Sequence, residues 1–148
     1  MSVKHANASV GYVPVSITDD TGRAAAGFAI EVIDETVLTA LAEAQDEREP
    51  DLIVELIDLY LEDAPQWIAA IHSQIAQADL ISLKHAAHTL KGSSGSVGVR
   101  QVAKICKLIE QMDDNALTAN GKMMLQLLDR EFARARAALL TERDRRLS

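Results

Sequence analysis

Residues 52–75 limit most strongly what this chain can fold into. Their apolar side chains recur at helical spacing, yet they cover more than one side of the helix. A helix that is apolar over so wide an arc has to be covered by several neighbours. Pro50 fits the first turn of this helix, and Pro65 predicts a kink or, alternatively, a break into two helices. The apolar residues of the stretch are Leu52, Ile53, Leu56, Ile57, Leu59, Tyr60, Trp67, Ile68, Ile71 and Ile75.

Four further amphipathic stretches supply those neighbours. Asp34 and Asp79 are suited to cap a short first helix and a third helix, and the third stops near Gly98. A fourth stripe covers residues 99–112, and a fifth helix starts near Thr118. Short connections make successive helices antiparallel. We therefore predict an all-α fold, an up-down antiparallel four-helix bundle with a short additional N-terminal helix.

The ends of the chain lack this periodicity. Residues 1–30 predict a flexible or loosely docked N-terminal arm with a short extended piece around Pro14. The bundle domain should cover residues 31–143, and residues 144–148 should fray. A regulatory role of the arm stays open.

Composition narrows the class of protein. Apolar residues make up 48% of the chain and aromatic residues only 3%, which indicates an aliphatic, helical core. No apolar run approaches the ~20 residues of a membrane span, and no signal-peptide pattern opens the chain. Cys106 is the one cysteine, so an intramolecular disulfide is excluded. We expect a cytoplasmic protein with no membrane contact, and an inert core thiol at Cys106.

Charge is unevenly distributed along the chain. The net charge of −7 disfavours nucleic-acid binding. Residues 34–63 contain eleven acidic residues against the single base Arg48. Residues 79–107 contain five basic residues against Asp79 alone. This second segment is suited to an acidic partner surface or a phosphoryl group.

An exposed histidine lies within the basic segment. On a helical wheel, His88 falls roughly 130° from the apolar side of its helix and therefore faces water. Gly92 and Gly95 share the exposed face, although each costs a helix about 1 kcal/mol relative to alanine. Two glycines beside an exposed histidine indicate close approach by something large.

The segment Ala87-His88-Thr89-Leu90-Lys91-Gly92-Ser93-Ser94, followed by Gly98, matches every position of A-H-x-L-K-G-[SA]-[SA]-x-x-x-G. This pattern resembles the signature of histidine-containing phosphotransfer (HPt) domains, and the similar helical layout covers roughly residues 34–141. The resemblance implies that His88 carries a phosphoryl group between receiver-domain aspartates in a multistep two-component phosphorelay. It also implies receiver domains of response regulators and of a hybrid histidine kinase as partners.

Neighbouring residues suit this role. A neutral imidazole is a competent nucleophile, and Lys91 and Lys84 lie on adjacent turns, where they could attract phosphoryl oxygens. Gly92 leaves room for a partner backbone. The remaining partner-docking residues are Ile81, His85 and Gly95.

The chain lacks the other parts of a phosphoryl-transfer enzyme. No phosphate-cradling loop and no acidic magnesium cluster accompany the motif. The partner must then supply both the aspartate and the magnesium ion. We expect a monomeric phosphocarrier that is not an enzyme and holds no metal or cofactor.

The motif segment also admits four other interpretations. A histidine-kinase dimerisation helix pair is disfavoured, since no acid follows His88 and no ATP-binding domain fits in the chain. A helical adaptor that binds a receiver domain without carrying phosphate remains open. A zinc site at His85 and His88 is disfavoured because no third ligand lies nearby in the sequence. A hydrolase with Ser93 as nucleophile is disfavoured because the G-x-S-x-G elbow is missing.

Overall fold

The computed structural model describes residues 12–14, 29–44 and 51–148, which form five helices and two short strands. Its elements are β1 (Tyr12–Pro14), β2 (Ala29–Glu31), α1 (Glu35–Ala44), α2 (Leu52–Ala76), α3 (Leu80–Ser96), α4 (Arg100–Glu110) and α5 (Asp114–Leu147).

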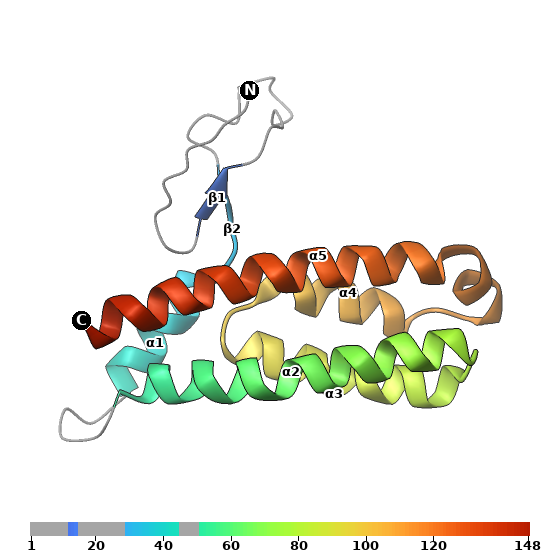
Figure 1. Ribbon diagram of the computed structural model, residues 1–148, viewed down its shortest axis with the longest axis horizontal. Helices are drawn as coiled ribbons and strands as arrows, with labels where there is room; N and C mark the ends of the chain where they lie inside the picture. Colours follow the sequence, from blue (N-terminus) through green and yellow to red (C-terminus); the bar gives the residue numbers. More distant parts are fainter. Residues whose placement is uncertain (1–11, 15–28, 45–50) are drawn as a thin grey trace.

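The four long helices form the expected bundle. Each packs against two others in the cyclic order α2, α3, α4, α5 and back to α2. In Figure 1, α2 and α5 lie in front, α3 and α4 lie behind, and α1 crosses the end of the bundle near the C-terminus. The predicted all-α class and up-down four-helix bundle are confirmed.

Aspartates fix where four of the helices begin, because an N-cap carboxylate accepts hydrogen bonds from the first free backbone amides. The Oδ1 atom of each accepts such a bond: Asp34 from Thr36 at 3.0 Å, Asp51 from Ile53 at 2.9 Å, Asp79 from Ser82 at 3.2 Å and Asp113 from Ala116 at 2.8 Å. The caps at Asp34 and Asp79 confirm the prediction.

Two predicted helix boundaries were wrong. Helix α5 begins at Asp114, four residues before Thr118, because Asp113 caps it. Helix α2 begins at Leu52 after its cap Asp51, so Pro50, which lies outside the described residues, precedes the first turn. Helix α2 also continues through Pro65 to Ala76, which excludes the alternative break.

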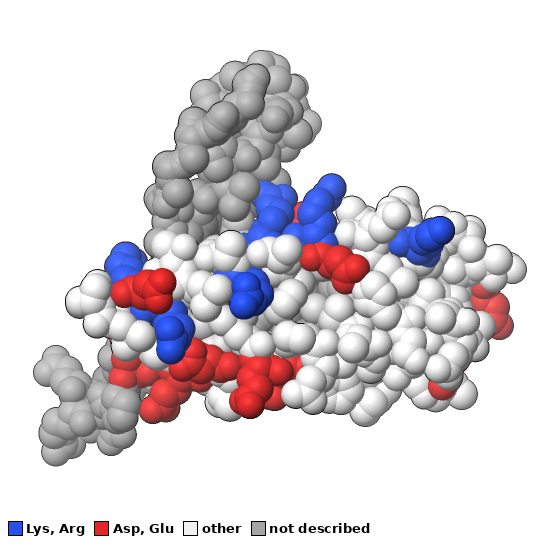
Figure 2. Space-filling view, in the orientation of Figure 1, with Lys and Arg blue, Asp and Glu red and all other residues white. Residues whose placement is uncertain are grey.

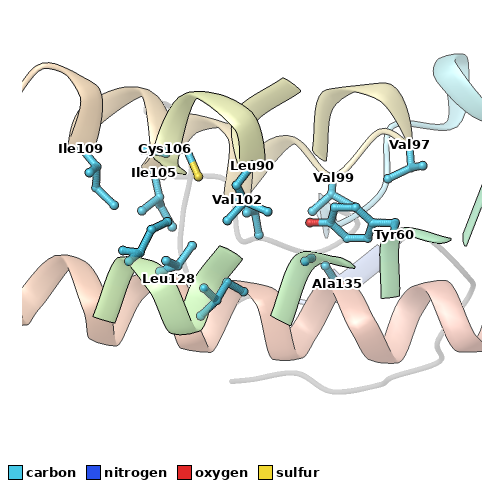
Figure 3. Close-up of a cluster of buried hydrophobic side chains, with 14 of the residues drawn as sticks. Tyr60, Leu90, Val97, Val99, Val102, Ile105, Cys106, Ile109, Leu128 and Ala135 are labelled. Atoms are coloured by element: carbon cyan, nitrogen blue, oxygen red, sulfur yellow. The ribbon is translucent and has the colours of Figure 1, made fainter. Parts of the chain in front are cut away.

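The core lies between all four helices and is mostly aliphatic. In Figure 3, Leu90 of α3 and Val102, Ile105 and Ile109 of α4 point toward Leu128 of α5. Tyr60 and Ser94 form a buried polar pair within this core, and their hydroxyl oxygens lie 2.8 Å apart. Ser94 is therefore part of the core.

Gly98 joins the start of α1 to the turn between α3 and α4. Its φ of +81° lies in the left-handed region that favours glycine. A Cβ atom at this position would lie 3.0 Å from the backbone oxygen of Asp34, and the Asp34 amide donates to the Gly98 carbonyl at 2.7 Å. Glycine at the last motif position thus permits close contact with the chain before α1.

The N-terminal region adds a small feature that was not predicted. Strands β1 and β2 pair antiparallel, with Tyr12 opposite Glu31 and Pro14 opposite Ala29. The extended piece expected around Pro14 thus coincides with β1. Most of the predicted arm at residues 1–30, namely residues 1–11 and 15–28, lies outside the described residues.

The C-terminal end is more ordered than the sequence indicated. Residues 144–147, expected to fray, continue helix α5. In this segment Arg145 and Arg146 donate to the fully buried carboxylate of Glu142 at 2.6–2.7 Å, and Arg143 donates to Asp58 of α2 at 2.6 Å.

Candidate functional site

His88 stands on the outer face of α3, where the sequence placed it. Its side chain is 68% exposed, whereas Leu83, Ala87 and Leu90 on the opposite face are completely buried. The buried face locks α3 against α2 and α4. The imidazole is therefore presented to solvent from a helix that is held on its other sides.

Glu110, at the end of α4, was not predicted as a site residue, yet it contacts two that were. Its Oε2 atom lies 2.8 Å from Nδ1 of His88, and its Oε1 atom lies 2.5 Å from Nζ of Lys91. The carboxylate thus bridges the histidine and the lysine. Glu110 is the only acidic residue of α4, which is the single sequence signal that marked it.

The electrostatics of this cluster define which imidazole nitrogen is available. The hydrogen bond from Lys91 lowers the pKa of Glu110 most, burial opposes the shift, and the His88 contact lowers the pKa further. The carboxylate is therefore ionised at neutral pH. Because an ionised carboxylate only accepts hydrogen bonds, Nδ1 of His88 must carry the proton. The neutral ring then has its lone pair on Nε2.

The other predicted site residues surround this cluster without joining it. The His85 ring meets the edge of Trp67 of α2, with centroids 6.4 Å apart. Ile81 is 86% exposed. Lys84 is half-buried and has no ion pair among the described residues. Lys91, expected beside a phosphoryl group, is engaged by Glu110 in this structure.

The two glycines of α3 leave a flat surface beside His88. A Cβ atom added to Gly92 or to Gly95 would meet no heavy atom within 4 Å. Neither glycine is therefore required by packing inside the protein. The space above them is open to a molecule that approaches from solvent.

The alternative chemistries find little support in this geometry. The Ser93 hydroxyl donates to the backbone oxygen of Leu90 at 3.2 Å, so it is satisfied within its own helix. Cys106 is buried, and burial raises the pKa of its thiol to about 12, which keeps it protonated. Across the described ranges, no three His, Cys, Asp or Glu side chains gather as a metal site would require.

Comparison with known families agrees with the motif and the fold. The family model described as the Hpt domain matches residues 55–138, more than half of the chain and including His88, Lys91 and Glu110. The chain belongs to the Hpt domain family.

Relatives of this Hpt domain include two with curated descriptions. Histidine-containing phosphotransfer protein 5 of Arabidopsis thaliana is 30% identical over 62% of this chain and 60% of its own length. Multistep phosphorelay regulator 1 of Schizosaccharomyces pombe is 31% identical over 54% of this chain and 27% of its own length. The chain thus spans less than two thirds of these relatives.

Solved structures resemble the Hpt domain over more of its length. Histidine-containing phosphotransfer protein B from Pseudomonas aeruginosa is 25% identical, with a TM-score of 0.64 over 77% of this chain and 96% of that one. A histidine-containing phosphotransfer protein from maize is 26% identical, with a TM-score of 0.67 over 79% and 88%. Among the described helices, none combines the length and apolar character needed to cross a membrane.

Proposed function

We propose that this Hpt domain is a histidine phosphocarrier, in which Nε2 of His88 accepts a phosphoryl group from one receiver-domain aspartate and passes it to another. One observation carries the proposal. The exposed imidazole of the family motif has its Nδ1 atom held by an ionised carboxylate at 2.8 Å, which leaves Nε2 as the nucleophile.

The transfer step needs little from this chain beyond that arrangement. The Nε2 lone pair forms a bond to phosphorus as the bond from phosphorus to the aspartyl oxygen breaks, and the aspartate leaves as a carboxylate. The Nδ1 proton stays on the ring, which becomes cationic, and Glu110 stabilises that charge at 2.8 Å. In the second transfer, the aspartate carboxylate of the next receiver attacks the phosphoryl group on His88. The bond from Nε2 to phosphorus breaks, and the lone pair returns to Nε2.

The remaining parts of the proposal concern the partners. Receiver domains of response regulators and of a hybrid histidine kinase supply the aspartate and the magnesium ion, so the protein is a carrier and not an enzyme. It acts as a cytoplasmic monomer that binds neither nucleic acid nor membranes. The negative net charge of −7 supports the absence of nucleic-acid binding.

The test is phosphoryl transfer from receiver domains of the source organism that have been phosphorylated with acetyl phosphate. Wild-type protein should acquire an acid-labile phosphoryl group, whereas His88→Gln should acquire none and keep its melting temperature, because the side chain is exposed. Labelling of the variant at His85 or elsewhere would contradict the assignment. Receiver binding without any labelling of wild-type protein would identify the adaptor instead.

A further inference from the structure

The helices on either side of α3 carry opposite charges. Helix α2 contains four acidic residues and neither lysine nor arginine: Glu55, Asp58, Glu62 and Asp63. Helix α4 contains three basic residues and the single acid Glu110: Arg100, Lys104 and Lys107. Helix α3, between them, has two lysines and no acid.

Two contacts set the level at which α2 lies against α3. Trp67 meets His85, and Tyr60 bonds to Ser94, so the two helices run antiparallel with these pairs at matching levels. Asp63 lies between Tyr60 and Trp67 and is therefore level with the segment that holds His88. Figure 2, which looks onto the face formed by α2 and α5, shows that further acidic side chains gather over the first half of α2.

The pair formed by Glu110 and His88 sets the level of α4 in the same way. Lys107 lies about one turn before Glu110, and Lys104 about two turns before it. Because α4 runs antiparallel to α3, these two lysines are level with the part of α3 from Lys91 toward Gly95. Both are exposed and form no ion pair in the described part of the chain. Arg100 continues the row at its beginning, 3.9 Å from Asp34.

An open strip separates the two charged rows. It consists of exposed residues of α3, and its glycines would meet nothing if a Cβ atom were added. A protein seated on this strip close enough to reach His88 spans both rows, because α2 and α4 each pack directly against α3. We name the exposed acids Glu62 and Asp63 the acidic rim, and Lys104 and Lys107 the basic rim.

We infer that these rims fix the orientation in which a receiver domain docks: a basic edge of the receiver faces the acidic rim, and an acidic edge faces the basic rim. The inference rests on the proposed function, since the occupant is the phosphoryl donor or acceptor. Opposite charges across an interface speed association and set register, and the reversed orientation would place like charges together.

The experiment separates orientation from net attraction. One variant reverses the basic rim (Lys104→Glu with Lys107→Glu), a second reverses the acidic rim (Glu62→Lys with Asp63→Lys), and a third combines all four changes. The combined variant keeps the wild-type net charge of −7, because two reversals of each sign cancel. The donor is the phosphorylated receiver domain that labels wild-type protein fastest.

Each double variant should accept the phosphoryl group about tenfold more slowly at low ionic strength, and the combined variant at least as slowly. The differences should shrink near 1 M salt, where the Debye length falls to about 3 Å. A combined variant that transfers at the wild-type rate would overturn the inference, because net charge alone would then govern docking. Double variants that transfer at the wild-type rate would also overturn it.

Three controls distinguish failure of the inferred docking orientation from failure of the proposed function. Phosphoramidate, a small chemical donor, should label all variants at the wild-type rate, because His88 itself is unchanged. Reversal of Lys122 and Arg136, which are exposed on α5 diagonally across the bundle from α3, should alter receiver transfer less than twofold. Variants with neutral rims (Lys104→Gln with Lys107→Gln, Glu62→Gln with Asp63→Asn) serve if a reversal unfolds the protein, and each should slow transfer by a smaller factor.

A nucleic acid is the other occupant that a basic row admits. If the reversed basic rim abolished binding of a single-stranded oligonucleotide while receiver transfer stayed at the wild-type rate, the inference would be wrong. If wild-type protein accepted no phosphoryl group from any receiver, the proposed function itself would fail.

Discussion

At the scale of single residues, the position of Glu110 matters most. One of its oxygens holds the His88 ring, and the other holds Lys91 at 2.5 Å. Lys91 therefore already forms an ion pair with Glu110. Because its ammonium group has three N–H donors, Lys91 can keep this contact and still donate to a phosphoryl oxygen under the proposed function. The carboxylate thus acts on both residues of the motif that bear charge during transfer.

Substitution Glu110→Gln should slow phosphoryl transfer to His88 about tenfold. The amide oxygen can still accept the Nδ1 hydrogen bond, but the negative charge that stabilises the cationic ring is lost, and hydrogen bonds to charged groups contribute about 1.5–3 kcal/mol. Single-turnover transfer from a phosphorylated receiver domain measures the effect. An unchanged rate would show that the carboxylate has no part in the reaction.

The same variant provides a pH test of stability. Because the folded protein lowers the pKa of Glu110 below its usual value of 4.5, the stabilisation is present above that value and is lost as the pH falls through the lowered pKa. Urea unfolding should therefore show wild-type protein more stable than Glu110→Gln at pH 7, with the difference shrinking as the pH falls below 4.5. A difference in stability that does not shrink as the pH falls would have a cause other than ionisation.

At the scale of the helices, α3 trades intrinsic stability for an open surface. Gly92→Ala should keep or raise the melting temperature, since alanine is favoured over glycine by about 1 kcal/mol in a helix and the added methyl group meets nothing. The same change should slow transfer, and Gly92→Gln should slow it more, because the side chains occupy the space beside the imidazole. Melting temperature and transfer rate are measured on both variants.

The two effects have opposite signs only if the space above Gly92 serves a partner. A destabilised Gly92→Ala protein would mean that the glycine is required by the fold. A stabilised protein with an unchanged transfer rate would mean that the partner does not approach this side of His88.

Helix patterns in the sequence predicted the bundle well because periodicity is a local signal. The boundaries that were wrong involve residues with two plausible roles: Asp113 follows the end of α4, yet it caps α5. Within the site, the exposed position of His88 followed from the wheel of α3. Glu110 could not be paired with it in advance, because the two lie 22 residues apart on different helices, and their contact depends on how α3 and α4 pack.

At the scale of the whole molecule, Gly98 ties the segment before α1 to the end of α3. Gly98→Ala should destabilise the protein by about 2 kcal/mol or more, because a left-handed backbone costs a residue with a side chain about 1–2 kcal/mol and its Cβ atom would press on the Asp34 backbone. Gly95→Ala is the matched control, since that Cβ meets nothing, and it should be neutral or stabilising. Urea unfolding of both variants measures the contrast; equal stabilities would contradict it.

The buried carboxylate of Glu142 shows a further limit of sequence reasoning at this scale. In the sequence it is one acid among several arginines, which reads as a solvated face. The structure buries it completely and surrounds it with Arg145 and Arg146, the latter also 3.5 Å from Asp51 at the start of α2. The long fifth helix is thereby attached to the end of the bundle where α2 begins.

The glycines of α3 have one more consequence. A helix that carries two of them on its outer face gains little from intrinsic propensity, so its shape depends on the apolar contacts with α2 and α4. His88 therefore has no local unit of its own that can open or survive separately from the core. Under the proposed function, loss of the bundle would therefore also remove the surface on which a receiver domain docks. Phosphoryl transfer should thus require the intact core, although His88 itself touches none of it.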